Sequence, residues 1–214
     1  MIYLYSGTPG SGKSLHQAKE IYDWLRRGRC CIANFDIDIS KIKRCKGNFI
    51  YLDNDYLTPE TLIKFSRIYF KDHKFAEGRL RVYIDECQLL FNAREWNTPG
   101  RKEWLSFFTQ HRKYGYDIFL IAQFDRMIDR QVRSLIEYEV IHRKASNYGV
   151  MGSWIGLFTD FFVAVRVWYP MKERIDAQFY TARKKYYSLY DTYNTFDSAK
   201  NIDANKAKVL TNTH

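Results

Sequence analysis

Eight residues near the start of the chain have the types and the spacing of a phosphate-binding loop. They fit the pattern G-x-x-x-x-G-K-[ST], in which glycines let the backbone turn so that successive N–H groups point at phosphate oxygens. The lysine of this pattern places a positive charge near the β- and γ-phosphates, and the serine hydroxyl can bind Mg²⁺. The sequence therefore predicts a site for a nucleoside triphosphate with Mg²⁺, formed by Gly7, Thr8, Pro9, Gly10, Ser11, Gly12, Lys13 and Ser14. Because the chain contains no N-K-x-D guanine-binding motif, we expect ATP as the nucleotide.

An acidic pair, Asp85 and Glu86, directly follows the apolar residues 80–84. In an open parallel sheet, ligands bind at the carboxyl ends of the strands. Asp85 is expected to hold the Mg²⁺ shell through water, and Glu86 to take a proton from the attacking water. Transfer to an organic acceptor needs no such base, so the pair favours hydrolysis. The alternative is a solvated acidic strand end that has no role in chemistry.

Gln123 follows another apolar segment, residues 118–122. If that segment lies beside residues 80–84 in the sheet, the Gln123 amide can contact both the γ-phosphate and the attacking water. The alternative is an ordinary loop glutamine. Hydrolysis of this kind often uses an arginine from a neighbouring subunit to stabilise the transferring phosphoryl group. Arg112 is the leading candidate, and Arg94 and Arg133 are the others. The alternative for each of the three is an ordinary surface arginine, with or without an ion pair, that has no role in the reaction.

The segments on both sides of the loop have the required character. Residues 1–5 are apolar and predict a strand, and residues 14–27 carry apolar side chains at helical spacing up to Gly28. A helix there would aim its amino end at the phosphates. The alternative, a Gly-Ser turn that matches the motif by chance, does not require these flanks.

The remaining segments alternate in type up to about residue 135 and then become mostly strands. Further strands are expected at 30–35, 49–52, 80–84 and 117–122, and helices from Thr58 onward, at 102–114 and at 126–134. Residues 161–168 and 177–182 predict a hairpin or an antiparallel addition to the sheet. The fold class expected is α/β: a P-loop NTPase with a mostly parallel sheet flanked by helices and antiparallel strands near the C-terminus.

Composition sets limits on the class of protein. The chain has 214 residues, 46% of them hydrophobic, which is enough for one α/β domain with a full core. The formal net charge is +10, which indicates either an anionic partner, such as nucleic acid or an acidic membrane surface, or only solubility.

Cysteine usage and apolar runs indicate a cytosolic compartment. The four cysteines form no C-x-x-C pair, so reduced thiols are expected rather than disulfides or a zinc site. No signal peptide is expected, because the loop begins at residue 7. The longest apolar run, residues 154–169, contains Asp160 and Arg166 and is too short to span a bilayer.

Taken together, these motifs resemble the amino-terminal domain of the zonula occludens toxin (Zot) family, which includes the assembly ATPases of filamentous phages. The resemblance covers about residues 1–195. It is carried by the loop at the very start of the chain, by residues 82–88 (VYIDECQ), 111–118 (HRKYGYDI) and 121–123 (IAQ), and by the closing residues 189–193 (LYDTY).

The resemblance implies an ATPase domain over residues 1–195, akin to FtsK–HerA motors. Residues 196–214 are expected to be a mobile tail or linker, because the chain from Asp197 has few large apolar residues. The resemblance implies a homo-oligomer, a hexameric ring being one form, that helps to extrude single-stranded DNA or a phage DNA–protein complex. It also implies a place at the cytoplasmic, inner face of the bacterial membrane, through a segment outside this chain or through partners. The alternatives are a bacterial DNA-translocating or packaging ATPase, and a nucleotide-switched assembly module with little turnover.

Overall fold

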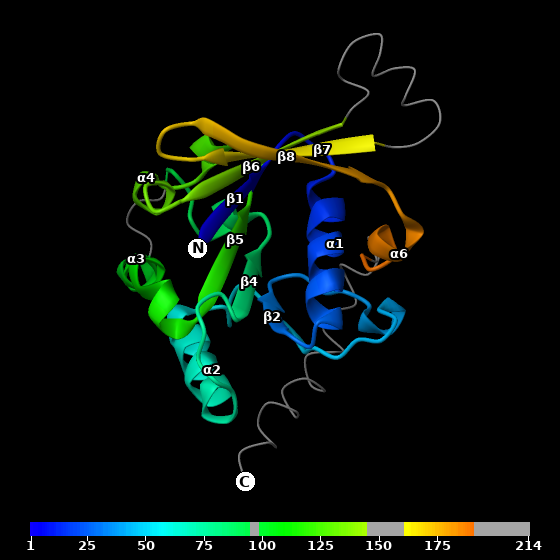
Figure 1. Ribbon diagram of the computed structural model, residues 1–214. Helices are drawn as coiled ribbons and strands as arrows, with labels where there is room; N and C mark the ends of the chain where they lie inside the picture. The colour runs from blue at the N-terminus through cyan, green and yellow to red at the C-terminus, as the bar shows by residue number, and fades with distance from the viewer. Residues whose placement is uncertain (95–98, 145–160, 191–214) are drawn as a thin grey trace.

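A single mixed sheet organises the molecule (Figure 1). The structure is a computed structural model, and it describes residues 1–94, 99–144 and 161–190. Within these ranges the sheet has eight strands. In sheet order they are β3 (Phe49–Tyr51), β2 (Cys30–Ala33), β4 (Leu80–Ile84), β5 (Tyr116–Ile121), β1 (Ile2–Ser6), β6 (Tyr138–Lys144), β7 (Phe161–Trp168) and β8 (Glu173–Thr181).

The sheet is parallel from β3 to β6 and antiparallel from β6 to β8. This confirms the expected mostly parallel sheet with antiparallel strands near the C-terminus. The two sheet edges differ in length, since β3 has three residues and β8 has nine. Because β4, β5 and β1 are adjacent and parallel, the chain leaves all three at the same edge of the sheet.

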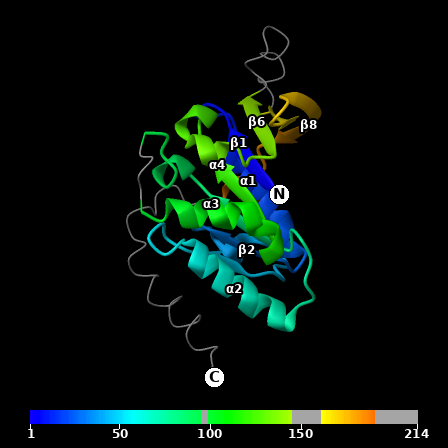
Figure 2. The same cartoon turned by 90° about the vertical axis from the view of Figure 1, so that its left-hand side faces the viewer.

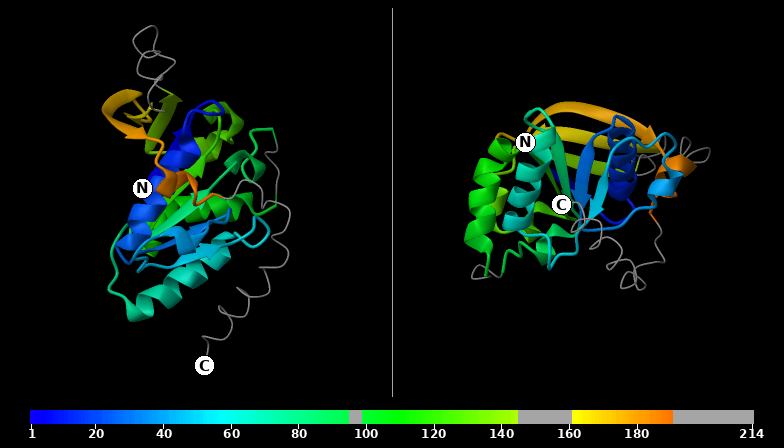
Figure 3. Two further views of the ribbon diagram at one scale, coloured as in Figure 1. Left: turned by 90° about the vertical axis from the view of Figure 1, so that its right-hand side faces the viewer. Right: turned by 90° about the horizontal axis from the view of Figure 1, so that it is seen from below.

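Helices cover both faces of the sheet, as the two further views show (Figures 2 and 3). One face carries α1 (Lys13–Arg26) and the short α6 (Lys184–Tyr187), which contact each other. The other face carries α2 (Pro59–Asp72), α3 (Arg101–Gln110) and the short α4 (Arg130–Arg133). Single 3₁₀ turns complete the described helices: η1 (Ile39–Lys41), η2 (Cys87–Leu89), η3 (His111–Tyr114) and η4 (Asp125–Met127).

Successive side chains of β1 point to opposite faces of the sheet and so pack into two separate apolar cores. Ile2 and Leu4 point to the α2 and α3 face, where they join Phe107 and Phe108. Tyr5 points to the α1 face and packs in the other core. Both cores are fully covered, which is the reason the central strands are apolar on both sides rather than alternating with polar residues.

Helix ends follow the signals in the sequence. Thr58 caps α2, because its Oγ1 accepts a hydrogen bond from the Thr61 N–H at 3.2 Å, and Pro59 is the first helical residue. Gly115 ends η3 with φ +72°, and a Cβ at that position would lie 2.6 Å from the Phe70 ring.

The prediction of one helix over residues 126–134 was wrong. The structure has η4 and then α4, with an interruption at Asp129. The Asp129 carboxylate accepts hydrogen bonds from the N–H groups of Gln131 and Val132 at 2.9 and 3.3 Å and pairs with Arg101 at 2.9 Å. A cap held this strongly begins a new helix instead of continuing the previous one.

Two expectations lie outside the described residues. The domain boundary at 195 and the tail over 196–214 fall beyond residue 190, and the first part of the apolar run over 154–169, residues 154–160, lies in the range 145–160. Among the helices that are described, none has the length and apolar character needed to cross a membrane.

Candidate nucleotide-binding site

The loop between β1 and α1 has the backbone that a phosphate cradle requires. Gly7, Gly10 and Gly12 have φ of +142°, +74° and +93°, values that side-chain-bearing residues rarely adopt. At Gly12 a Cβ would lie 2.5 Å from the Phe162 ring, so glycine is needed there for space as well. The first turn of α1 has no side-chain cap and no acidic residue, which leaves its N–H groups available to an anion.

Lys13 lies over the loop, where its side chain can reach a bound phosphate. Its Nζ donates hydrogen bonds to the carbonyl oxygens of Gly7 at 2.5 Å and Thr8 at 3.3 Å. Partial burial lowers the pKa of Lys13, whereas the nearby carboxylates of Asp85 and Glu86 raise it. These attractions place both acids in the neighbourhood of the lysine.

Asp85 lies at the end of β4 and is held from its backbone. Asn34, which follows β2, accepts a hydrogen bond from the Asp85 N–H at 2.7 Å and donates one to the Asp85 carbonyl at 2.8 Å. Burial raises the pKa of the Asp85 carboxyl, and the Glu86 N–H and the Lys13 charge act in the opposite direction. Asp85 is therefore a half-buried carboxylate that faces the loop lysine.

Glu86 has the next position and a different environment. It is exposed and has φ +45°, the left-handed conformation that non-glycine residues seldom adopt. The Gln88 side-chain amide donates a hydrogen bond to its carboxylate. This backbone turn directs Glu86 out of the strand end, and the amide orients the carboxylate.

Gln123 follows β5, which lies between β1 and β4 in the sheet. The neighbour relation that the sequence analysis required for Gln123 is therefore present. Its carbonyl accepts a hydrogen bond from the Gly7 N–H at 3.1 Å, which ties the end of β5 to the start of the phosphate loop. The structure brings Lys13, Asp85, Glu86 and Gln123 together at one sheet edge.

The candidate arginines are not part of this cluster. Arg112 lies in η3, before β5, so it is at the opposite edge of the sheet, where it pairs with Glu137 at 2.6 Å. Arg94 and Arg133 follow the carboxyl ends of β4 and β5. A role for Arg112 in a neighbouring subunit's site stays a prediction.

The antiparallel strands reach the loop, a contact that was not among the expectations from the sequence. The Tyr180 hydroxyl of β8 donates a hydrogen bond to the Gly12 carbonyl at 3.0 Å, and the Phe162 ring of β7 lies against Gly12. Asn34 was also missed, although it follows a buried strand as Asp85 and Gln123 do. Its place directly after a strand could have identified Asn34 from the sequence, whereas no local pattern indicates Tyr180 or Phe162.

Two buried histidines form a second unforeseen contact beneath the loop. His142 of β6 donates from Nδ1 to the Ser6 carbonyl at 3.1 Å, so its Nε2 is the acceptor of the 2.9 Å bond to His16 Nδ1. Burial lowers the pKa of His16 to about 4 and that of His142 to about 3. Both rings are therefore neutral at pH 7, and the pair fixes the end of β1 against α1.

The residues present fit a nucleotide with Mg²⁺. The buried Ser11 Oγ at the base of the loop has no hydrogen-bond partner among the described residues. Backbone N–H groups, one ammonium group, the Ser14 hydroxyl and the Asp85 carboxylate are the donor set that phosphates and Mg²⁺ take. The fold and this loop together define the chain as a P-loop NTPase by structure.

The chain belongs to the zonular occludens toxin (Zot) family, whose sequence profile matches residues 1–196. This confirms the resemblance inferred from the motifs. Among similar proteins, the Gene 1 protein of Enterobacteria phage M13 is 24% identical over 226 residues, covering 98% of this chain and 64% of that protein. The Gene 1 protein of Escherichia phage If1 is 26% identical over 215 residues, covering 92% of this chain and 60% of that protein. The chain thus spans less than two thirds of these relatives.

Solved structures give the same fold. The N-terminal domain of zonular occludens toxin from Neisseria meningitidis has a TM-score of 0.54 and 22% identity, covering 89% of this chain and 98% of that one. The genome packaging NTPase B204 of Sulfolobus turreted icosahedral virus 2, in complex with ATP-gammaS, has a TM-score of 0.51 and 17% identity, covering 84% and 96%. At these identities the likeness establishes the fold class and leaves the activity to the site.

Proposed function

We propose that the chain is the ATP-hydrolysing motor domain of a filamentous phage assembly and extrusion machine. The observation that carries the proposal is the grouping of Lys13, Asp85, Glu86 and Gln123 at the carboxyl ends of β1, β4 and β5. Family membership and the phage Gene 1 relatives support the assembly role.

Each residue at this edge has one task in the proposed reaction. The loop N–H groups and Lys13 hold the phosphates and offset their charge. Ser14 and, through water, Asp85 would hold Mg²⁺, which would supply further charge neutralisation. Glu86 accepts the proton of the attacking water, and the Gln123 amide orients that water beside the γ-phosphate.

A packaging or DNA-translocating ATPase is the second candidate, and the fold shared with a genome packaging NTPase favours it. Both candidates use the same ATP chemistry and differ in the substrate that is moved. In either case we propose a ring-shaped homo-oligomer, a hexamer in the leading form, working on single-stranded DNA or a phage DNA–protein complex at the inner face of the bacterial membrane. The third candidate, a nucleotide-switched module with little turnover, leaves the water-activating position of Glu86 without a use.

The first test is Lys13→Ala, measured by ATP binding and by steady-state phosphate release with and without single-stranded DNA. We expect both binding and turnover to fall below detection, because the variant removes the only loop side chain that brings a positive charge to the phosphates. The matched control is Lys19→Ala, a partly exposed lysine six residues further along α1 that pairs with Asp23. Normal turnover by Lys13→Ala would refute the loop assignment.

A further inference from the structure

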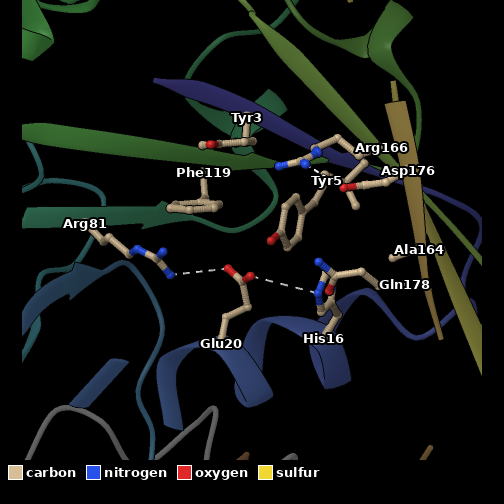
Figure 4. A pocket seen from close by; sticks show the side chains of 11 residues that line it. Tyr3, Tyr5, His16, Glu20, Arg81, Phe119, Ala164, Arg166, Asp176 and Gln178 are labelled. Carbon is tan, nitrogen blue, oxygen red and sulfur yellow. Dashed lines mark hydrogen bonds and ion pairs between the residues drawn. The ribbon is translucent and has the colours of Figure 1, made fainter. Parts of the chain in front are cut away.

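A polar cavity lies between α1 and the sheet, apart from the phosphates' position on the loop (Figure 4). Its volume is about 160 Å³, and one water needs about 10–15 Å³ of such space, so it has room for a small organic group. Its walls come from α1 on one side and from the sheet on the other, where β4, β5, β1, β6, β7 and β8 each contribute lining residues. The polar side chains in these walls are His16, Glu20, Arg81, Arg166, Asp176 and Gln178.

The charges in the cavity cancel in pairs. Arg81 bonds Glu20 at 3.3 Å, and Arg166 bonds Asp176 at 2.5 Å. Each guanidinium therefore has its own carboxylate. A charged guest would leave one net charge in a half-buried space, which is unfavourable, so the cavity suits a guest without net charge.

Three nitrogen atoms in the cavity are buried and lack a hydrogen bond of normal geometry, although the Gln178 amide lies within interaction range of His16. The three atoms are His16 Nε2 and the Nε atoms of Arg81 and Arg166, judged over the described part of the chain. His16 is 4% exposed. Because its Nδ1 donates to His142, its Nε2 carries a lone pair, and that lone pair is directed toward Glu20, whose Oε1 is 4.0 Å away. The cavity thus offers one acceptor near α1, His16 Nε2, and one unsatisfied N–H donor on each arginine.

The sheet side of the cavity is aromatic. Tyr3 and Phe119 stack with their ring centres 4.9 Å apart, and Tyr5 lies between them and His16 in the close-up. Aromatic walls favour a flat guest. The side chains of Arg166 and Asp176 are each 38% exposed, so the cavity opens to solvent on the β7 and β8 side.

We propose that this cavity binds a nucleobase that carries an exocyclic amino group. Such a base is flat, has no net charge, and presents N–H donors beside ring-nitrogen or carbonyl acceptors. The amino group would donate to His16 Nε2 and the Glu20 carboxylate, and the base's acceptors would take N–H bonds from the arginines. Gln178, which is exposed on β8 and faces the same space, can bond the base edge with its amide. The site does not require ATP hydrolysis, so it stands apart from the proposed motor function.

Single-stranded DNA and free nucleotides both carry such a base. The experiment measures fluorescence anisotropy of labelled oligodeoxycytidine, oligodeoxyadenosine and oligothymidine of equal length, at one salt concentration, without ATP. Phosphate contacts are common to all three. Thymine has a carbonyl oxygen where cytosine has its amino group, and that oxygen would face the His16 lone pair. We expect cytosine and adenine oligomers to bind about tenfold tighter than thymine oligomers.

Substitutions in the cavity test whether the preference for cytosine and adenine oligomers over thymine oligomers arises there. Ala164→Leu adds a side chain from β7 into the space, and Gln178→Leu keeps the size of the residue but removes its amide; both should reduce the tenfold preference to about twofold or less. Glu173→Gln, on the same strand but outside the cavity, should keep the preference. Thermal unfolding checks that each variant is folded. In His16→Asn, the Asn amide can replace Nδ1 toward His142 while the Nε2 acceptor is lost, so this variant should also lose the preference.

The two sources of the base are separated by competition with free deoxycytidine monophosphate. If millimolar nucleotide displaces the oligomer, a free nucleotide suffices; if it does not, the base must be part of a strand. Lys13→Ala should keep the preference, and so a failure of ATP binding is distinguished from a failure of this cavity. Equal affinity for the three oligomers, or an unchanged preference in folded Ala164→Leu, would overturn the proposal.

Discussion

Asp85 and Glu86 are neighbours in the chain, but the structure gives them different surroundings. Asp85 is half-buried, its pKa is raised by that burial, and its backbone is held on both sides by Asn34. Glu86 is exposed and turns away through a left-handed backbone conformation. A carboxylate with a fixed backbone suits metal holding, and an exposed carboxylate oriented by the Gln88 amide suits proton transfer, so we predict that Asp85 serves binding and Glu86 serves turnover.

This division predicts the behaviour of Glu86→Gln. The variant should bind ATP with Mg²⁺ about as well as the wild type, because Glu86 makes no contribution to holding the ground state. Turnover should fall by about 10²–10⁴-fold, the usual contribution of a positioned general base. Nucleotide affinity is measured by equilibrium titration and turnover by phosphate release.

The control for Glu86→Gln is Glu60→Gln, at an exposed position in the first turn of α2. It removes the same charge far from the loop and should leave both quantities unchanged. Wild-type turnover in Glu86→Gln would remove this residue from the mechanism.

At the scale of elements, local pattern predicted most strands and helices, whereas it could not predict which of them touch. The spacing of apolar residues predicts the helix at residues 13–26 and the strand at residues 80–84. The meeting of the carboxyl ends of β1, β4 and β5 at one edge follows from their parallel arrangement. The contact between His16 and His142 joins residues 126 apart in sequence. It depends on the pairing of β6 with β1, which places His142 over α1, and no local signal specifies that pairing.

The reach of β8 to the loop predicts an effect of Tyr180→Phe on ATP affinity. The variant removes the hydrogen bond to the Gly12 carbonyl and keeps the ring, so the loop loses one support. We expect ATP binding to weaken about two- to tenfold, which corresponds to about 0.5–1.5 kcal/mol for one hydrogen bond. The control is Tyr187→Phe, at an exposed tyrosine in α6. Equal affinities in the two variants would show that β8 gives the loop no support.

The buried histidine pair predicts a loss of stability in mild acid. The pKa values of His16 and His142 in the folded chain are about 4 and about 3, below the usual 6.5, so the unfolded chain binds more protons below pH 6.5. The two neutral histidines contribute fully to the free energy of unfolding above pH 6.5, and this contribution declines as the pH falls from 6.5 toward 4 and 3. Denaturant unfolding at pH 7, 6 and 5 should show a loss of about 1–2 kcal/mol for each histidine by pH 5. A constant free energy of unfolding from pH 7 to pH 5 would contradict this assignment.

The two ends of the parallel strands carry different groups. The carboxyl edge of the parallel strands carries the loop and the acids, and the amino edge carries Arg112 paired with Glu137. An arginine at the amino edge cannot reach the loop of its own subunit. It can act only on the loop of a neighbour, and only after it leaves Glu137.

Mixing two variants tests this arrangement. Arg112→Ala and Lys13→Ala should each be inactive alone in an ATPase assay. Their mixture should recover part of the activity, because some interfaces then join an intact loop to an intact arginine. Lys113→Ala, at the adjacent exposed residue, should be active by itself. No recovery at any ratio, or full activity of Arg112→Ala alone, would exclude Arg112.

The position of β1 in the sheet has a consequence for how the chain is made. Ile2 pairs with Ile118 of β5 and Tyr3 with Tyr138 of β6, so the first strand synthesised must wait for strands made more than a hundred residues later. At about 5–20 residues per second, that wait is on the order of ten seconds on the ribosome. The phosphate loop directly follows β1 and is therefore among the last parts of the chain to fold.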